Sequence, residues 1–289
     1  MKKVKVLIVG KSNVGKSSLI NYFSNKHSAL VSNKLHSTRI STSHIIDYNN
    51  VHIEFIDTPG ASIDDNNLLS KAMKSNASKY MTNADIIILL TQPQEKYDYE
   101  IKIKNQIIEC NKKYILCVNK IDLDSSGQYK DNLFISLGVN EASFVSVKES
   151  IGIDSLYTLI KDKIISEGIE GTDKLNNERN NINIIQELIR ESIINRTNKE
   201  LPYETAVHIS DYKVQSRSDV IKADIIVSKD NHKKIIIGKK GAMIRNIGIE
   251  ARELIELYLG KKIHLSLFVV VKDNWKNNPT VLKDIGYIE

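Results

Sequence analysis

The sequence predicts an α/β fold with a doubly wound, mostly parallel sheet, followed by a smaller α+β domain. Over the first 167 residues, short apolar runs alternate with stretches of helical periodicity. This alternation is typical of a parallel sheet with helices on both faces. A polar, glycine-bearing segment follows at residues 168–178, and the pattern then restarts in a different order. We therefore expect two domains, at residues 1–167 and 179–289, joined by a linker at 168–178.

Apolar runs and apolar periodicity locate the elements of the first domain. Continuous or alternating apolar runs predict strands at residues 4–9, 51–56, 85–90, 114–118 and 143–147. Helical spacing predicts helices at residues 17–25, 66–81, 99–111 and 153–165. In a sheet of this kind the ligand site forms from the loops at the carboxyl ends of the strands. Binding residues are therefore expected on those loops.

The first such loop has the sequence of a phosphate-binding loop. Between the first strand and the first helix the chain reads Gly10-Lys11-Ser12-Asn13-Val14-Gly15-Lys16-Ser17, which fits G-x-x-x-x-G-K-[ST]. The glycines let backbone N–H groups point inward, and the helix N-terminus adds positive potential. We expect Lys16 to reach the β and γ phosphates, Ser17 to offer an oxygen to Mg²⁺, and Ser18 to add to the nucleotide contacts.

A second loop supplies groups for the metal and the terminal phosphate. Asp57 ends the run 51–56, so its carboxylate is expected at the carboxyl end of a strand, near the phosphate loop. It can hold a magnesium-bound water there. The chain continues as Thr58-Pro59-Gly60, and Gly60 can present a backbone N–H to the γ-phosphate. Thr58 is expected to be structural.

Two further motifs identify the base. Asn119-Lys120-Ile121-Asp122 follows a buried strand, and a fixed carboxylate such as that of Asp122 can accept hydrogen bonds from N1–H and N2–H₂ of guanine. Adenine has an acceptor at N1 and would leave this carboxylate unpaired, a mismatch that a binding site rejects strongly. In Ser146-Val147-Lys148, the backbone N–H of Val147 would donate to guanine O6. The expected nucleotide is GTP or GDP.

After residue 178 the sequence predicts helix, strand, strand, glycine loop, helix and strand. The first helix ends before Pro202 and carries isoleucines at helical spacing, namely Ile182, Ile185, Ile189 and Ile193. Strands are expected at 204–210, 219–228 and 263–272. The residues around Trp275 are expected to form a C-terminal capping extension.

The glycine loop Gly238-Lys239-Lys240-Gly241 is expected to bind RNA. Its glycines let a sugar-phosphate backbone approach, its lysines supply charge, and the following helix adds its dipole. Further basic residues of this surface are Lys233, Lys234 and Arg245, and Ile235 to Ile237 with Ile244 are expected as an apolar floor for bases. Two alternatives stay open, since exposed lysines can be merely solvated and isoleucines at helical spacing are mainly a burial signal.

The charge distribution agrees with a polyanionic partner for the second domain. Residues 179–289 carry 19 basic and 14 acidic side chains, so +5 of the net charge of +6 lies there. The two cysteines, Cys110 and Cys117, have no metal-binding spacing and are expected to be reduced. No apolar run reaches the length of a membrane span, and no signal-peptide segment follows the first residue. A cytoplasmic protein is expected.

Taken together, the motifs of the first domain resemble the five G-boxes of the translation-factor-like GTPases. The phosphate loop with Asn13, the triplet Ser37-Thr38-Arg39 and the Asp-Thr-Pro-Gly segment resemble the Era family in particular. The glycine loop of the second domain resembles that of a type II KH domain, and a G domain followed by such a domain is the Era architecture. One departure is Val147, where the family usually has alanine. Because that contact is through the backbone, the change should matter little.

The resemblance implies roles for several residues. Thr38 would bind Mg²⁺ with Ser17 and Asp57, and Asn13 is a candidate ligand for K⁺. The catalytic residues would be Lys16, Thr38, Gly60 and Asn13. Ala61 stands where Ras-type enzymes have a water-orienting glutamine, so slow intrinsic hydrolysis is implied.

The resemblance also implies a function. The chain would be a GTP-hydrolysing assembly factor that binds the 3′ end region of small-subunit ribosomal RNA and acts on the pre-30S particle. A monomer is expected. Peripheral membrane association is reported for the family, and nothing in this sequence indicates it. The alternative is an RNA-binding module whose G domain is a nucleotide-stabilised scaffold with negligible turnover, serving transfer RNA modification or a membrane assembly.

Overall fold

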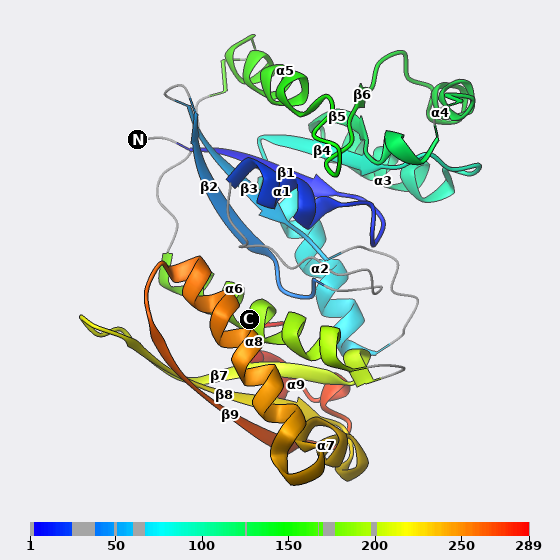
Figure 1. The fold of residues 1–289 in the computed structure, drawn as a ribbon. Helices are drawn as coiled ribbons and strands as arrows, with labels where there is room; N and C mark the ends of the chain where they lie inside the picture. Colours follow the sequence, from blue (N-terminus) through cyan, green and yellow to red (C-terminus); the bar gives the residue numbers. More distant parts are fainter. Residues whose placement is uncertain are drawn as a thin grey trace. The chain divides into compact units, whose positions relative to one another are not determined.

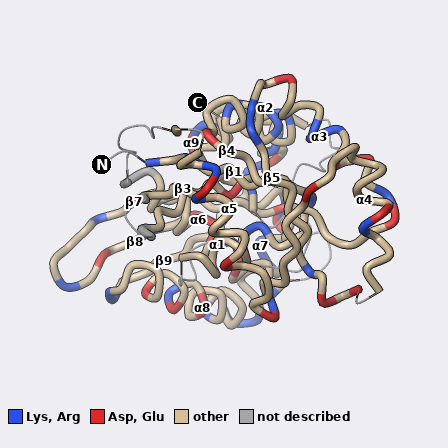
Figure 2. The backbone as a smooth tube through the Cα atoms, turned by 90° about the horizontal axis from the view of Figure 1, so that it is seen from above, with Lys and Arg blue, Asp and Glu red and all other residues tan. Residues whose placement is uncertain are grey.

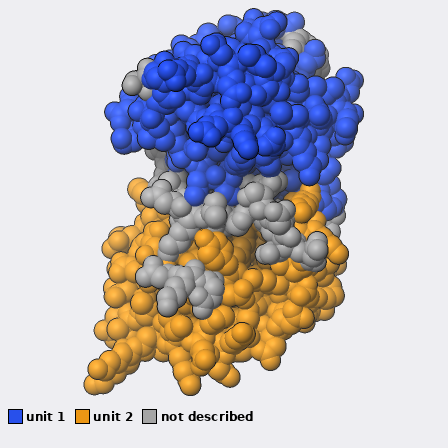
Figure 3. Space-filling view, turned by 90° about the vertical axis from the view of Figure 1, so that its right-hand side faces the viewer, with its two compact units in different colours: residues 1–24, 41–62, 75–175 blue, residues 25–40, 63–74, 176–289 orange. Residues whose placement is uncertain are grey.

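The chain folds into two compact units whose segments are not continuous in sequence. The structure is a computed structural model that describes residues 3–24, 38–48, 51–59, 67–124, 126–166, 168–169, 177–197 and 201–288. The first unit comprises residues 1–24, 41–62 and 75–175, and the second unit comprises residues 25–40, 63–74 and 176–289 (Figure 3). The domain boundaries expected at residues 167 and 179 stay a prediction.

A six-stranded, mostly parallel sheet forms the centre of the first unit (Figure 1). Its strands are β1 Val4–Val9, β2 Thr42–Tyr48, β3 Val51–Asp57, β4 Ile86–Thr91, β5 Lys113–Val118 and β6 Ser143–Phe144. The spatial order is β2-β3-β1-β4-β5-β6. In this sheet β2 pairs antiparallel with β3, and the other described pairs are parallel. The order places the carboxyl ends of β1, β3, β4 and β5 at one edge of the sheet.

Helices cover both faces of this sheet. They are α1 Lys16–Ser24, α2 Leu68–Asn83, α3 Asp98–Glu109, α4 Tyr129–Leu137 and α5 Ile153–Ser166. On one face, Ile107 of α3 and Leu133 of α4 join Ile56 in a buried cluster. On the other, Phe23 of α1 stacks on Phe55 and meets Tyr157 of α5 edge-on, at ring centroid distances of 5.0 and 5.4 Å. The predicted doubly wound α/β fold is confirmed.

The second unit contains a three-stranded sheet. Its elements are α6 Asn177–Arg196, β7 Thr205–Lys213, β8 Asp219–Val227, α7 Asp230–Ile237, α8 Ala242–Leu259, β9 Ile263–Val271 and α9 Pro279–Ile285. β7 pairs antiparallel with β8, and β8 pairs parallel with β9. Residues of α6 and α8 pack on one face of this sheet, where Val207 and Ile225 are buried. Ala206 and Ile226 face the opposite way and pack with Trp275 and α9.

Among the described α-helices and β-strands, four were not expected from the sequence, namely β2, α4, α7 and α9. α7 covers Lys233, Lys234 and the isoleucines at 235–237 that were expected to flank the glycine loop, and Ile236 in it is buried in the core. The strand expected at 143–147 is shorter than predicted, because Ser146 pairs with Ile151 instead of continuing along β5. Among the described residues, no helix has both the length and the apolar character needed to cross a membrane.

Candidate functional site

The phosphate loop between β1 and α1 needs glycine at both of its marked positions. A Cβ on Gly10 would lie 2.2 Å from the backbone oxygen of Leu90 at the end of β4. Gly15 has φ +100°, and a Cβ there would lie 2.2 Å from the side-chain nitrogen of Asn119. Real Cβ atoms do not approach other atoms so closely. The loop is therefore packed against the ends of β4 and β5, where a side chain at either glycine would not fit.

Lys16 is buried inside this loop. Its Nζ donates to the backbone oxygens of Gly10 and Lys11, at 3.1 and 2.8 Å. Burial lowers the pKa of Lys16 to about 8, against the opposing influence of the Asp57 carboxylate. Phosphate oxygens entering the loop would be further acceptors for the same ammonium group.

Nucleotide affinity is expected to be highest below pH 8 and to fall as the pH rises above it. The pKa of Lys16 is about 8 with the contacts of this structure, and a bound phosphate would raise it because it favours the ammonium form. Binding above pH 8 therefore takes up a proton. Calorimetry of GTP binding at pH 9 in buffers of different ionisation heat measures this uptake, with pH 7 as the control. Equal heats in all buffers at pH 9 would contradict the assignment.

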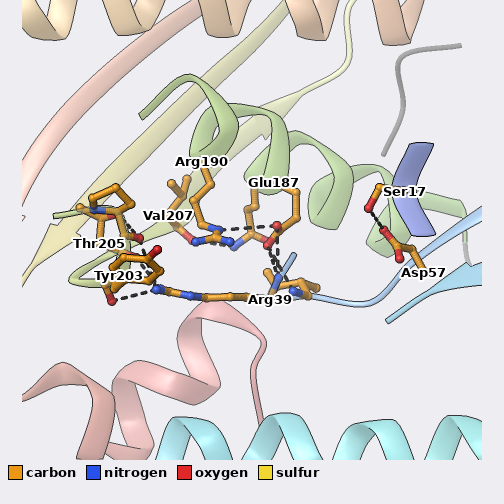
Figure 4. Close-up of polar contacts among 11 residues, drawn as sticks. Ser17, Arg39, Asp57, Glu187, Arg190, Tyr203, Thr205 and Val207 are labelled. Carbon is orange, nitrogen blue, oxygen red and sulfur yellow. Dashed lines mark hydrogen bonds and ion pairs between the residues drawn. The ribbon is translucent and has the colours of Figure 1, made fainter. Parts of the chain in front are cut away.

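Two predicted magnesium ligands lie together at the start of α1. The Ser17 hydroxyl donates to a carboxylate oxygen of Asp57 at 2.6 Å (Figure 4), and both residues are buried. Mg²⁺ takes oxygen ligands and usually keeps several waters beside one or two protein groups. A hydroxyl and a carboxylate from neighbouring elements fit that preference. Thr58 has a structural contact as expected, since its hydroxyl donates to the backbone oxygen of Ile8 at 2.9 Å.

The other residues predicted to contact the phosphates or the metal ions lie in different places. Ser18 lies in the first turn of α1, and Asn13 has a left-handed backbone with φ 65°. Thr38 is buried and belongs to the second unit by its contacts. Gly60, together with Ala61, lies outside the described residues. Its proposed contact with the γ-phosphate therefore stays a prediction.

The base-recognition motif is bonded directly to the phosphate loop. The side-chain amide of Asn119 donates to the Val14 backbone oxygen at 2.8 Å and accepts from the Val147 N–H at 3.1 Å. Lys120 donates through Nζ to the Asn13 backbone oxygen. One asparagine thus joins three loops, from the ends of β1, β5 and β6. The phosphate loop and the base-recognition motif therefore lie side by side in the first unit, whereas Thr38 belongs to the second unit by its contacts.

Asp122 is exposed and held in place by Ser146. The Ser146 hydroxyl donates to an Asp122 carboxylate oxygen at 2.6 Å, and this bond is the main cause that lowers the pKa of Asp122. The carboxylate is therefore ionised at neutral pH and can accept from two donors of a base. Lys148 is also exposed and pairs with Glu149 at 3.0 Å. The positioning role of Ser146 was missed, although its place two residues before Lys148 was noted.

The glycine loop of the second unit connects α7 to α8. Gly238 has φ 70°, and a Cβ there would lie 2.6 Å from the Cβ of Met243. Lys240 and Gly241 also have positive φ, of 51° and 76°. Lys239 and Lys240 are exposed at this turn. The loop therefore holds its two lysines outward on a backbone that requires glycine beside them.

The residues around this loop divide into exposed and buried groups. Lys234, Ile235 and Arg245 are exposed, and Lys233, Ile237 and Ile244 are partly buried. Ile236 is fully buried, so this residue belongs to the core and not to the expected apolar floor. α8 carries both basic and acidic residues along its length, two of the former and three of the latter (Figure 2). The expected RNA surface therefore takes its basic side chains mainly from α7, the loop and the first turn of α8.

Comparison with known proteins assigns both units. Residues 5–120 match the family described as 50S ribosome-binding GTPase, and residues 200–276 match the KH domain. GTPase Era of Fusobacterium nucleatum subsp. nucleatum is 35% identical over 297 residues, covering 100% of both chains. GTPase Era of Lactobacillus helveticus is 35% identical over 288 residues, covering 98% of this chain and 95% of that protein.

Solved structures resemble the whole chain. A single-residue variant of Aquifex aeolicus Era bound to GDP·AlF₄⁻ aligns with a TM-score of 0.86 at 30% identity, covering 100% of both chains. A crystal structure of Era in complex with MgGDPNP and nucleotides 1506–1542 of 16S ribosomal RNA aligns with a TM-score of 0.87, also at 30% identity and full coverage. The likeness therefore extends over both units of the chain.

Proposed function

The chain belongs to the Era family of GTPases, and from this premise we propose that it binds the 3′ end region of small-subunit ribosomal RNA and acts in maturation of the 30S subunit. One observation carries the proposal. A related protein that aligns over the entire chain was crystallised with MgGDPNP and nucleotides 1506–1542 of 16S ribosomal RNA. The glycine loop of the second unit supports it, because exposed lysines flanked by positive-φ glycines suit a sugar-phosphate backbone.

The chain hydrolyses GTP, and we propose that its described residues provide most of the nucleotide contacts. Lys16 would contact the phosphates, and Asp122 would accept hydrogen bonds from guanine. Mg²⁺ would be held by Ser17 and Asp57, where it would neutralise charge on the transferred phosphoryl group. We propose in addition that Thr38 is a magnesium ligand, that Gly60 contacts the γ-phosphate, and that Asn13 binds K⁺. We also propose that the protein is a monomer and acts in the cytoplasm.

Reversing the charge of the glycine loop tests the RNA-binding role. In the double variant Lys239→Asp/Lys240→Asp, RNA affinity is expected to fall by at least about tenfold, and the slope of log K against log salt to lessen by about 1.4, because two phosphate contacts are lost from a single strand. Titration of a labelled RNA carrying the 3′ region of small-subunit ribosomal RNA measures both. GTP affinity should stay unchanged, because the loop contributes nothing to the nucleotide site.

A matched control distinguishes the loss of a direct RNA contact from the change in the protein's net charge. Lys71 and Lys74 are two exposed lysines of the same unit, so Lys71→Asp/Lys74→Asp changes the total charge by the same amount away from the loop. It should leave most of the RNA affinity intact. Equal loss in both double variants would mean that the loop is not the RNA contact.

A further inference from the structure

A buried carboxylate lies beside the phosphate loop of the first unit. Glu100, in the first turn of α3, is fully buried, and glutamate is almost never buried without a partner. Its Oε1 accepts from the Thr91 hydroxyl, at the end of β4, at 3.0 Å. Its Oε2 lies 3.5 Å from Nζ of Lys11, the second residue of the phosphate loop, and has no hydrogen-bond partner within the described part of the chain. Lys11 is therefore the charged partner of this carboxylate.

The Lys11 side chain is also held by neighbours of Glu100. Its Nζ donates to the side-chain oxygen of Gln94 at 3.3 Å and lies 5.8 Å from the centre of the Tyr99 ring. The Gln94 amide donates in turn to the Thr91 hydroxyl at 3.4 Å. These contacts form a closed network that joins the phosphate loop to the end of β4 and the start of α3. Thr91, Gln94 and Glu100 belong to none of the motifs from which the nucleotide site was predicted.

The backbone of Lys11 contacts the lysine of the phosphate-binding motif. Its carbonyl oxygen accepts from Nζ of Lys16 at 2.8 Å, and the Gly10 oxygen accepts from the same ammonium group at 3.1 Å. Gly10 is confined by its close approach to the end of β4. The place of the Lys11 carbonyl depends on its side chain, which Glu100 holds. The ammonium group of Lys16 is therefore linked to Glu100 through a single residue.

We infer that Glu100 is a positioning residue for GTP hydrolysis, because it holds Lys11 and thereby the carbonyl that orients the ammonium group of Lys16. The inference rests on the proposed contact of Lys16 with the phosphates. All the contacts that carry it lie within the first unit. A reacting group misplaced by about 1 Å can slow a reaction by about 100-fold, whereas nucleotide affinity also comes from the loop N–H groups and the base. A loosened Lys11 should therefore slow hydrolysis more than it weakens binding.

Glu100→Gln is the variant that tests the inference. The amide keeps the shape of the side chain and can still accept from Thr91, but it loses the charge that attracts Lys11. The rate constant for hydrolysis of bound GTP, measured in single-turnover reactions with Mg²⁺, should fall about tenfold. Affinity for a non-hydrolysable GTP analogue, measured by calorimetry, should change much less. A partly unfolded variant would instead bind less nucleotide, and the rate constant of its bound fraction would be unchanged.

Variants of Lys11 show whether Glu100 acts through this residue. Lys11→Met should slow hydrolysis as Glu100→Gln does, and the double variant should be no slower than Glu100→Gln, because both changes remove the same contact. The double variant also serves if Lys11→Met does not fold, since it leaves no unpaired buried charge. Lys11→Arg keeps the cation and should retain most of the rate. Glu109→Gln is the matched control, because it removes one charge from an exposed position of the same helix, and it should keep the full rate.

The outcomes distinguish this inference from its premise. Full hydrolysis in Lys16→Ala would contradict the proposed phosphate contact of Lys16. Loss of hydrolysis in Lys16→Ala together with a full rate in Glu100→Gln would overturn the inference alone. A double variant clearly slower than Glu100→Gln would also overturn it, since Lys11 would then act on the phosphates directly. An equal loss in Glu109→Gln would do the same, because the effect would be general to the charge of α3.

Discussion

Replacing Asp122 by Asn is expected to weaken GTP binding by about 100- to 1,000-fold, because two charge-assisted hydrogen bonds to guanine are lost, at about 1.5–3 kcal/mol each before partial compensation. The variant should gain affinity for xanthosine triphosphate, whose C2 oxygen can accept from the new amide. Competition between the two nucleotides for a labelled GTP analogue measures the exchange. The Ser146 hydroxyl that holds Asp122 at 2.6 Å can still donate to the asparagine oxygen, so the loop should keep its conformation.

Asp124→Asn is the matched control for this experiment. Asp124 lies two residues further along the chain, and its carboxylate accepts from the Ser126 hydroxyl at 2.6 Å. It also loses one charge in the same loop, so any general electrostatic effect should appear in both variants. GTP affinity should be retained in Asp124→Asn. Full GTP affinity in Asp122→Asn would show that Asp122 does not read the base.

Replacing Gly15 by Ala is expected to weaken GTP binding by about 100-fold or more, because the backbone conformation and the neighbouring side chain both exclude a Cβ. The residue has φ +100°, and the new atom would lie 2.2 Å from the Asn119 amide. Asn119 would have to move, and it is the side chain that joins the loops of Val14 and Val147. Phosphate and base contacts should therefore be lost together. Calorimetry with GTP and with free guanosine detects both losses.

Gly127→Ala is the matched control, because it introduces backbone strain at a positive φ without a steric clash. Gly127 has φ +70°, and among the described residues the one heavy atom within 4 Å of a Cβ there is Cε of Lys130, at 3.9 Å. Gly127→Ala therefore adds a comparable backbone strain without a collision. It should cost about 1 kcal/mol or slightly more in stability and leave GTP affinity intact. If Gly15→Ala binds GTP as well as Gly127→Ala does, the loop can accept a side chain at residue 15.

The nucleotide site could be predicted because its parts are local in sequence and fixed by topology. The phosphate loop and the motifs at Asp57, Asn119 and Ser146 each follow a strand, and parallel strands bring their carboxyl ends to one edge. Apolar runs were enough to find those strands. The identity of the base was inferred from the carboxylate of Asp122 together with the backbone N–H of Val147.

Other features depend on contacts that no local pattern encodes. The backbone N–H of Arg39 donates to the buried carboxylate of Glu187, 148 residues away in sequence, and neither residue has a neighbour in sequence that indicates this contact. α7 has eight residues, of which His232 and Ile236 are buried. Two buried positions in so short a segment are too few to reveal helical periodicity in the sequence. Thr38 was expected beside the phosphates from its motif, and its contacts with the second unit could not be read from the sequence.

The second unit is built from three separate segments of the chain, so the RNA-binding domain cannot simply be cut out and studied by itself. A fragment starting at residue 176 would lack Arg39, Ile40, Leu69 and Met73, which this unit draws from the N-terminal half of the chain. Water would then reach the indole of Trp275 and its apolar neighbours, and Glu187 would lose two of its hydrogen-bond donors. Because this apolar surface would be exposed, the fragment is expected to aggregate. Recombinant work on RNA recognition is better served by full-length protein carrying substitutions.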